Sequence, residues 1–195
     1  MALLRSVSAP DPGPLIHGGT IYLRLPQMAD YMAWARVRAV SRGFLTPWEP
    51  SWSSNELTRT SYRRRVRHYV REAREDTGYA FFLFRTADDE LLGGLTLSNV
   101  RRGVTQACTL GYWVGEPHAQ QGHMTAGMRA LIPFVFDGLQ LHRLEAACLR
   151  NNTASTRLLE KCRFQQEGIA KRYLRINGIW QDHILYALID DDPRP

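Results

Sequence analysis

The order of secondary-structure patterns along the chain predicts an α/β fold, in which a mixed, mostly antiparallel sheet is flanked by helices on both faces. Three observations lead to this prediction. One strand pattern near the start precedes two helix patterns, and three further strand patterns then follow one another through short turns. The last part of the chain reads helix, strand, helix and hairpin. Helices placed between strands must cover the faces of a shared sheet.

The first elements are read from periodicity and capping residues. Residues 20–25 alternate in the manner of a half-buried strand. Asp30 is the expected N-cap of a helix with apolar residues at helical spacing. Segment 44–54 contains two prolines and is predicted to be irregular, because proline lacks the backbone donor that regular elements need.

A basic amphipathic helix is predicted over residues 59–74, with Ser53 or Ser54 as its cap. This segment holds seven arginines and one histidine, and it supplies much of the net charge of +6. One interpretation is a solvated surface helix whose arginine stems cover the core. The other is electrostatic steering toward a ribosome or an acidic substrate.

Three strands with short turns are predicted next. Residues 79–85 and 91–99 flank a turn at 87–89, and a second turn at 101–103 leads into a strand at 107–114. This succession predicts an antiparallel meander.

The remaining elements cross back to the sheet. Apolar residues at helical spacing start at Met124, and Pro133 inside this helix should kink it at a cost of about 3 kcal/mol if uncompensated. A strand at 144–149 and a helix at 153–162 follow. The final hairpin turns at Asn177 and Gly178, a pair typical of a type I′ turn.

Length and composition indicate one globular domain. A chain of 195 residues with 44% hydrophobic residues can bury a single core but is short for two ordinary domains. We assign residues 15–190 to this domain, 1–14 to a flexible tail rich in proline, and 191–195 to a C-terminal tail. A monomer or a weak dimer is expected.

Several classes of protein are not expected. No run of about 18 apolar residues indicates a membrane span, and no secretory signal pattern is visible. The three cysteines lie in apolar patterns and are interpreted as reduced core thiols of a cytoplasmic protein. No cluster of histidines and cysteines has metal-ligand spacing, so no metal is expected.

A phosphate-binding junction is predicted where the strand ending at Val114 gives way to a polar loop and a helix. The first N–H groups of a helix have no partner within the helix, and the helix dipole favours an anion there. Gly122 would let the backbone approach such an anion closely, because it has no Cβ. Many junctions of this kind bind nothing, so the motif needs context.

That context comes from a series of motifs in a fixed order. They read GYWVG, QQGHMT, HRLEA, NNTAS, LLEKCRF and EG, and the segments LTPWEP and YLRINGIWQDH flank them. Together these motifs resemble the GNAT (Gcn5-related) acetyltransferases, and within them the branch that contains the ribosomal-protein-alanine N-acetyltransferases. The resemblance runs from about residue 20 to residue 189. It implies acetyl-CoA as the co-substrate.

The resemblance also implies where acetyl-CoA binds. Its pyrophosphate would lie against main-chain N–H groups of one loop, formed by Gln120, Gln121, Gly122, His123, Met124 and Thr125. The family pattern departs from this chain at Ala119 and Met124, which predicts weakened rather than absent binding. Gln120 or Gln121 could supply a replacement amide.

The pantetheine arm would lie in a cleft between two strands that separate. Main-chain groups of Tyr112, Trp113 and Val114 would bond its amides, although the two aromatic side chains could simply pack in the core. Asn152 would contact the arm, with Ser155 one turn further on. Helix capping would account for both of these residues equally well.

The catalytic groups are less defined. Glu145 lies where many relatives carry a glutamate that accepts a proton through water, although its spacing to Asn152 differs by two residues; a structural role is the alternative. The tyrosine that serves many relatives as general acid falls on Leu159, so Tyr173, His183 or a water would have to replace it. The predicted substrate rim consists of Trp48, Glu49, Trp180 and Asp182.

An α-amine suits a site that lacks a strong base. Its pKa is about 7.7–8.0, against about 10.4 for lysine, so a useful fraction is neutral near pH 7. Positioning and desolvation could then supply most of the catalysis. This favours a protein N-terminus, with a ribosomal protein or the ribosome as partner, as the acceptor.

Two other functions stay open. One is acetylation of a small amine such as a polyamine, an aminoglycoside or a toxin. The other is a non-catalytic acyl-CoA- or RNA-binding module, which the altered loop, the absent tyrosine and the basic helix would favour. Contact with nucleic acid is otherwise expected only through association with a ribosome, and no membrane partner is expected.

Overall fold

The computed structural model describes residues 13–195, and in them it has one eight-stranded sheet of order β1-β2-β3-β4-β5-β6-β8-β7. The strands are β1 (Ile16–His17), β2 (Ile21–Arg24), β3 (Tyr79–Arg85), β4 (Leu91–Arg101), β5 (Ala107–Val114), β6 (Arg143–Leu149), β7 (Gln165–Ile176) and β8 (Ile179–Ile189). Strands β5 and β6 pair in parallel, whereas the other neighbours are antiparallel. The predicted mixed, mostly antiparallel sheet is confirmed.

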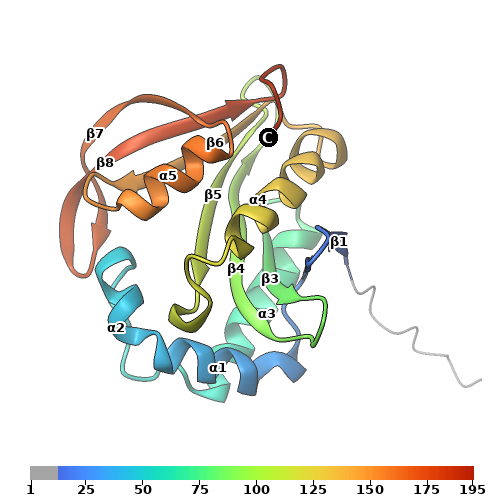
Figure 1. Ribbon diagram of the computed structural model, residues 1–195, viewed down its shortest axis with the longest axis vertical. Helices are drawn as coiled ribbons and strands as arrows, with labels where there is room; N and C mark the ends of the chain where they lie inside the picture. Colours follow the sequence, from blue (N-terminus) through green and yellow to red (C-terminus); the bar gives the residue numbers. More distant parts are fainter. Residues whose placement is uncertain (1–12) are drawn as a thin grey trace, which may run out of the picture.

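Helices cover both faces of this sheet, as Figure 1 shows. The helices are α1 (Tyr31–Val40), α2 (Arg42–Leu45), α3 (Arg59–Arg74), α4 (His123–Pro133) and α5 (Thr153–Lys161). Helices α4 and α5 pack on one face around Met128, Leu131 and Leu159, which belong to the larger hydrophobic core. Helices α1 and α3 pack on the other face, where Trp34 and Tyr62 belong to a second core.

One of the two capping predictions is wrong, and the other is right in position. The cap of α3 is Thr58, whose hydroxyl accepts a hydrogen bond from the Ser61 N–H (3.3 Å), so neither Ser53 nor Ser54 fills that position. Asp30 is the N-cap residue of α1, as predicted, although its side chain makes no capping bond to that helix. Its carboxylate instead accepts from the Gln27 N–H and from Arg24, because a short 3-10 turn (Met28–Asp30) comes directly before α1.

Segment 44–54 is more ordered than its prolines suggest. Helix α2 extends to Leu45, and a 3-10 turn follows over Thr46–Trp48. Pro47 lies in the first positions of this turn, where a backbone N–H has no helical partner and its loss has little effect. The expectation of wholly irregular structure is therefore wrong here.

The irregularity predicted at Pro133 takes the form of a change in helix type. Helix α4 ends at this residue, and a π-helical turn (Phe134–Gly138) continues the chain. The turn closes with a hydrogen bond from the Leu139 N–H to the Phe134 carbonyl (2.8 Å). In the last hairpin Asn177 and Gly178 both have positive φ, at 44° and 81°, which agrees with the predicted type I′ turn.

The ends of the chain and the cysteines complete the fold. The predicted N-terminal tail lies almost wholly in residues 1–12, outside the described residues. At the other end Arg194 pairs with Asp137 (2.6 Å). All three cysteines are buried and free, in keeping with core thiols. Within residues 13–195, no helix combines the length and the apolar character that crossing a membrane requires.

Candidate active site

Strands β5 and β6 separate halfway along β5. They pair from Ala107 opposite Arg143 to Leu110 opposite Ala146. Beyond this point β5 stays paired with β4 through Val114, and β6 pairs with β8. The edge of β5 from Gly111 to Val114 therefore has no partner strand among the described residues. Main-chain groups of Tyr112, Trp113 and Val114 lie on this edge, where a cleft for pantetheine is predicted.

The two faces of β5 lead to different surroundings. Tyr112 and Val114 pack against the core under α4 and α5, whereas Trp113 packs against the core under α1 and α3. This alternation is the normal consequence of strand geometry. The side chains at the open edge of β5 thus belong to both cores.

The loop after β5 forms an anion-binding shape. Gln120 and Gly122 have φ of 59° and 82°, so both are left-handed, and Gly122 is the N-cap of α4 without a side-chain cap bond. The first hydrogen bond of α4 runs from Ala126 N–H to the Gly122 carbonyl (3.0 Å). The N–H groups of the three preceding residues, His123, Met124 and Thr125, consequently have no acceptor inside the helix.

The side chains of this loop are occupied locally. Gln121 donates through Nε2 to the Pro117 carbonyl (2.8 Å), and its Oε1 lies 3.3 Å from Nε2 of His123. Burial lowers the pKa of His123, with smaller contributions from Arg85 and His118, so His123 is neutral near pH 7. Positive potential at this loop therefore comes from the main chain and from the helix dipole.

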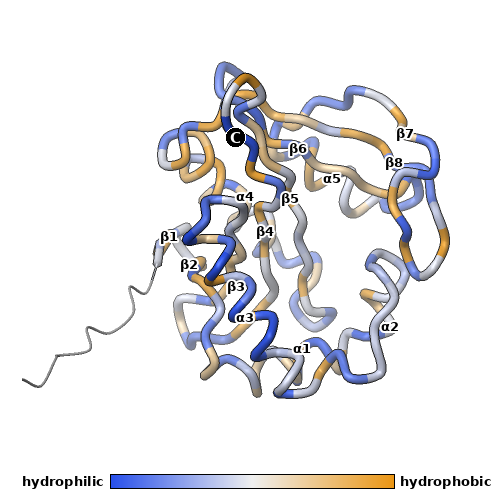
Figure 2. The backbone as a smooth tube through the Cα atoms, turned by 180° about the vertical axis from the view of Figure 1, so that it is seen from behind, coloured by the Kyte–Doolittle hydropathy of each residue, from blue (hydrophilic) through white to orange (hydrophobic). Residues whose placement is uncertain are grey.

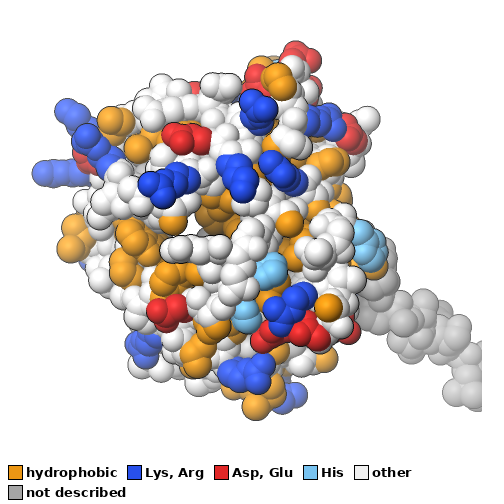
Figure 3. Space-filling view, viewed as in Figure 1, with side chains coloured by type: hydrophobic (Ala, Val, Ile, Leu, Met, Phe, Trp, Pro, Cys, Tyr) orange, Lys and Arg blue, Asp and Glu red, His pale blue; other side chains and the backbone are white. Residues whose placement is uncertain are grey.

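A cavity of about 510 Å³ opens beside the loop and adds two cations to it. Gly122, Thr125 and Ala126 line it together with Arg129 from α4 and Lys161 from the end of α5. Figure 3 shows several Lys and Arg side chains over α5 and α4 on this side of the molecule. Sequence reasoning missed both cations, although Arg129 lies four residues after Thr125 on the same helix face.

Asn152, Ser155 and Tyr112 meet at the start of α5. Oδ1 of Asn152 accepts from the Ser155 N–H (3.1 Å), so Asn152 caps α5, which is one of the two roles considered for it from the sequence. The Ser155 hydroxyl is hydrogen-bonded to the Tyr112 hydroxyl and links α5 to the open end of β5. Burial raises the pKa of Tyr112 well above its usual value, so this phenol stays neutral.

A second cavity lies on the opposite face of the sheet and has a volume of about 400 Å³. It reaches the open edge of β5 at Gly111, Tyr112 and Trp113. Aromatic and charged side chains line the rest, chiefly Trp34, Arg38, Glu49, Trp52, Glu56, Arg65, Tyr69 and Phe82. This cavity therefore reaches β5 from the face of α1 and α3, whereas the first cavity lies on the face of α4 and α5 and is lined by α4, Gly18 and Lys161.

Arg38 and Glu49 form a closed ion pair in this second cavity. The two terminal nitrogens of Arg38 each lie 2.7 Å from one oxygen of Glu49, and Trp52 Nε1 donates to the same carboxylate (2.8 Å). The guanidinium lies 4.3 Å and 5.0 Å from the ring centres of Trp52 and Trp113, and Arg38 is only 7% exposed. Because both charges are paired, the buried arginine is tolerated.

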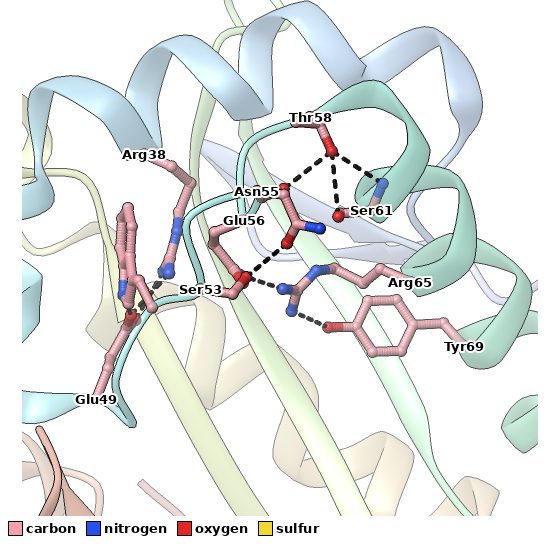
Figure 4. A network of polar contacts seen from close by, with 10 residues as sticks. Arg38, Glu49, Ser53, Asn55, Glu56, Thr58, Ser61, Arg65 and Tyr69 are labelled. Atoms are coloured by element: carbon pink, nitrogen blue, oxygen red, sulfur yellow. Dashed lines mark hydrogen bonds and ion pairs between the residues drawn. The ribbon is translucent and has the colours of Figure 1, made fainter.

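A second ion pair stands beside the first, as Figure 4 shows. Arg65 of α3 pairs with Glu56 and contacts the Tyr69 hydroxyl (3.4 Å), and its guanidinium lies 5.5 Å from the Trp34 ring centre. Of the predicted rim residues only Glu49 lines the cavity. Arg38, Glu56 and Arg65 were missed, because nothing in their sequence spacing signals that they meet.

The other predicted rim residues lie further away. Trp48 is half-buried at the end of the 3-10 turn, Trp180 is 60% exposed on β8, and Asp182 accepts from the Arg172 N–H (2.9 Å). Their hairpin nevertheless touches the cavity segment, since the Asn177 N–H donates to the Glu49 carbonyl (2.9 Å).

Glu145 lies outside both cavities. It is opposite Thr109, one step before the last β5–β6 pair, and Arg101 and Arg143 hold its two oxygens. Arg143 also pairs with Glu167. The side chain is 31% exposed, so solvent water can reach it, although it lines neither cavity.

The residues named as substitutes for the general acid are in contact with each other. Tyr173 meets His183 edge to face, with ring centres 6.0 Å apart, and His183 is buried with Nδ1 2.9 Å from the Gln181 carbonyl. Leu159 is fully buried in the core. Among residues 13–195, no group of three or more His, Cys, Asp or Glu side chains could hold a metal ion.

Comparisons with known proteins identify relatives of this chain. The family model described as "Acetyltransferase (GNAT) domain" matches residues 20–165. The "Probable N-acetyltransferase YjcK" of Bacillus subtilis is 32% identical over 91% of this chain and 98% of its own length. The "[Ribosomal protein uS5]-alanine N-acetyltransferase" of Escherichia coli is 33% identical over 90% of each chain.

A solved structure extends the likeness to three dimensions. The structure described as "Mycobacterium smegmatis RimJ in complex with CoA-disulfide" has a TM-score of 0.83 and 34% identity, covering 92% of this chain and 87% of its own. The predicted fold and family are thereby confirmed. The chain belongs to the GNAT acetyltransferase family.

Proposed function

We propose that this N-acetyltransferase moves the acetyl group of acetyl-CoA to the free α-amine of a protein N-terminus, with the N-terminal alanine of a ribosomal protein as the acceptor. The observation that carries the proposal is the open edge of β5 from Gly111 to Val114: an aromatic and polar cavity reaches it on one face of the sheet, and the N-terminus of α4 with two nearby cations lies on the other face. One cavity holds unpartnered helix N–H groups and cations, and the other is aromatic and polar. A donor with its phosphates at the start of α4 would extend its pantetheine arm to this edge, where an amine in the second cavity would meet it.

The donor side fits acetyl-CoA. N–H groups at the start of α4, together with Arg129 and Lys161, would bind its phosphates. Main-chain groups of Tyr112 to Val114 would bond the pantetheine amides and polarise the thioester carbonyl. Asn152 would contact the arm while it caps α5.

The acceptor side fits a peptide chain. Its aromatic walls would enclose apolar groups of the first residues, and the N-terminal amine would lie at the β5 edge. The hairpin of β7 and β8 touches the Glu49 segment, so Trp180 and Asp182 would contact residues further along the acceptor. The cavity suits a peptide better than a small polyamine. A polyamine is cationic and would need free carboxylates, whereas Glu49 and Glu56 are both paired with arginines.

The chemistry is a direct attack of the neutral amine on the thioester carbonyl. At pH 7.5 about a third of an α-amine with pKa near 7.8 is neutral, against about a thousandth of a lysine amine with pKa near 10.4. Glu145 is the proposed proton acceptor and would act through water, because it lies near the point where β5 and β6 separate. The CoA thiolate would leave and take up a proton, for which Tyr173 and His183 are the proposed donors.

The test is release of CoA from acetyl-CoA with two peptides. One carries a free N-terminal alanine and an internal lysine, and the other is identical except for a blocked α-amine. Release with the first peptide alone supports N-terminal transfer. Equal release with both would indicate lysine as the acceptor. Release with neither, in the presence of measured acetyl-CoA binding, would favour a small-amine acceptor or a non-catalytic role.

A further inference from the structure

The outer face of α3 carries a row of arginines that the proposed reaction does not use. They are all exposed: Arg59, Arg63, Arg64, Arg67, Arg71 and Arg74. Figure 2 shows α3 as a strongly hydrophilic helix on the outside of its sheet face. The inner face of the same helix is apolar, with Tyr62 and Val66 buried in the core.

None of these six arginines has a carboxylate partner within the described residues. The ion pairs of α3 use only Arg65, which binds Glu56, and His68, which binds Glu72. Arg71 contacts the His68 ring (3.2 Å), and Arg59 lies 5.7 Å from the Tyr31 ring centre. The positive charge of this face is therefore not neutralised by the protein itself.

The spacing of the charges is regular. Arg59, Arg63, Arg67 and Arg71 follow one another at intervals of four residues, which is about 6 Å along a helix axis, and the whole row spans about 22 Å. Like charges four residues apart repel one another and disfavour the helix. A linear polyanion would relieve this repulsion along the entire row.

The composition of the face points to a nucleic acid rather than to a protein. A protein interface normally has an apolar centre surrounded by polar groups. On α3 the apolar side chains point inward or are half-buried, and the exposed row has none. Arginine also binds phosphate groups through paired N–H donors, and binding to a nucleic acid backbone needs little else.

We propose that the outer face of α3 is an RNA-binding surface, which contacts the phosphate backbone without reading bases. The choice of RNA rests on the proposed function, since the N-terminus of a ribosomal protein lies among RNA. The same helix contributes Arg65 and Tyr69 to the second cavity, the proposed acceptor site. RNA bound along its outer face would thus lie next to the entrance that an acceptor chain uses.

The test measures binding of the full chain to a fluorescein-labelled RNA hairpin by fluorescence anisotropy at several KCl concentrations. With four to six phosphates contacted, the slope of log K against log[KCl] should be roughly −3 to −5. The triple variant Arg63→Gln/Arg67→Gln/Arg71→Gln should bind at least tenfold more weakly at 0.1 M KCl, with a slope shallower by about 2 to 3.

A matched variant makes the same change of charge elsewhere. Arg157, Arg163 and Arg172 are exposed on α5, just after it, and on β7. Their joint replacement by Gln should leave both the affinity and the slope within a factor of two of the parent chain. If it weakens binding as much as the α3 variant does, net charge and not this surface is responsible, and the proposal is overturned.

Two further arms separate the proposal from its alternatives. Polyglutamate at the same concentration of charge should fail to displace the RNA; displacement would indicate a general surface for acidic proteins and would overturn the assignment to RNA. Acetylation of a free peptide should be unchanged in the α3 variant, because these arginines lie outside both cavities. Loss of RNA binding with intact peptide acetylation therefore supports the surface independently of the acceptor, and intact RNA binding overturns it.

Discussion

Replacement of Gly122 by alanine tests the cofactor loop most sharply. The φ of Gly122 is 82°, and a Cβ added there would meet no atom within 4 Å. The substitution would consequently produce no clash, and its cost is that of a left-handed alanine, about 1–2 kcal/mol. In a chain of this size that loss lowers Tm by roughly 2–8 °C.

Gly122 lines the first cavity and lies next to the first N–H groups of α4, so the added methyl group would stand close to the predicted phosphate position. We expect it to hold a phosphate away from one of those donors. A hydrogen bond to a charged group contributes about 1.5–3 kcal/mol, so the Kd for acetyl-CoA should rise about 10- to 100-fold. Isothermal titration calorimetry measures this change directly.

Gly103 offers a control with the same backbone cost. Its φ is 68°, a Cβ there would also meet nothing within 4 Å, and it lies in the turn between β4 and β5. Gly103→Ala should lower Tm by the same amount and leave the Kd for acetyl-CoA unchanged. If the two variants bind acetyl-CoA equally well, the assignment of the α4 N-terminus as the phosphate site is refuted.

Three other perturbations have defined outcomes. Glu145→Gln should lower kcat about 10²- to 10⁴-fold with KM nearly constant. The control is Glu167→Gln, which also removes an ion pair with Arg143. An equal fall in kcat in the two variants would contradict a role of Glu145 as the base. Arg38→Gln leaves a carboxylate unpaired and should cost about 3–5 kcal/mol in denaturant unfolding, and a loss below about 1 kcal/mol would contradict the buried ion pair. Burial raises the pKa of the Cys108 thiol from 9.0 to about 12. The neutral thiol therefore contributes fully to the free energy of unfolding below pH 9, and above pH 9 that free energy should fall by up to about 1.4 kcal/mol per pH unit. Cys108→Ala should reduce this slope.

Local signals in the sequence predicted most of the fold. The strand-forming runs of β3 to β5 are separated by short turns, and Asn177-Gly178 marks the last hairpin, so these elements follow from short-range rules. The cap of α3 was misplaced at Ser53 or Ser54, whereas Asp30 is the N-cap residue of α1, as predicted, but makes no capping bond. Before α3, Ser53, Ser54, Asn55 and Thr58 are all cap-forming residues, and the choice among them depends on where the preceding chain packs.

The donor side of the site was easier to predict than the acceptor side. Gly122 and the start of α4 are contiguous in sequence, whereas the second cavity joins α1, α3, β5 and the segment after α2. The pairing of Arg38 with Glu49, and of Arg65 with Glu56, arises only when these elements pack together. Arg129 and Lys161 come from two helices and line the same cavity only because those helices pack side by side.

The position of the transferred acetyl group tests the central claim most directly. A peptide with a free N-terminal alanine and an internal lysine is incubated with the enzyme and acetyl-CoA, and tandem mass spectrometry then locates the added group. The account predicts acetylation of the α-amine, with the lysine unmodified. An acetyl group on the lysine, with the N-terminus left free, would contradict it.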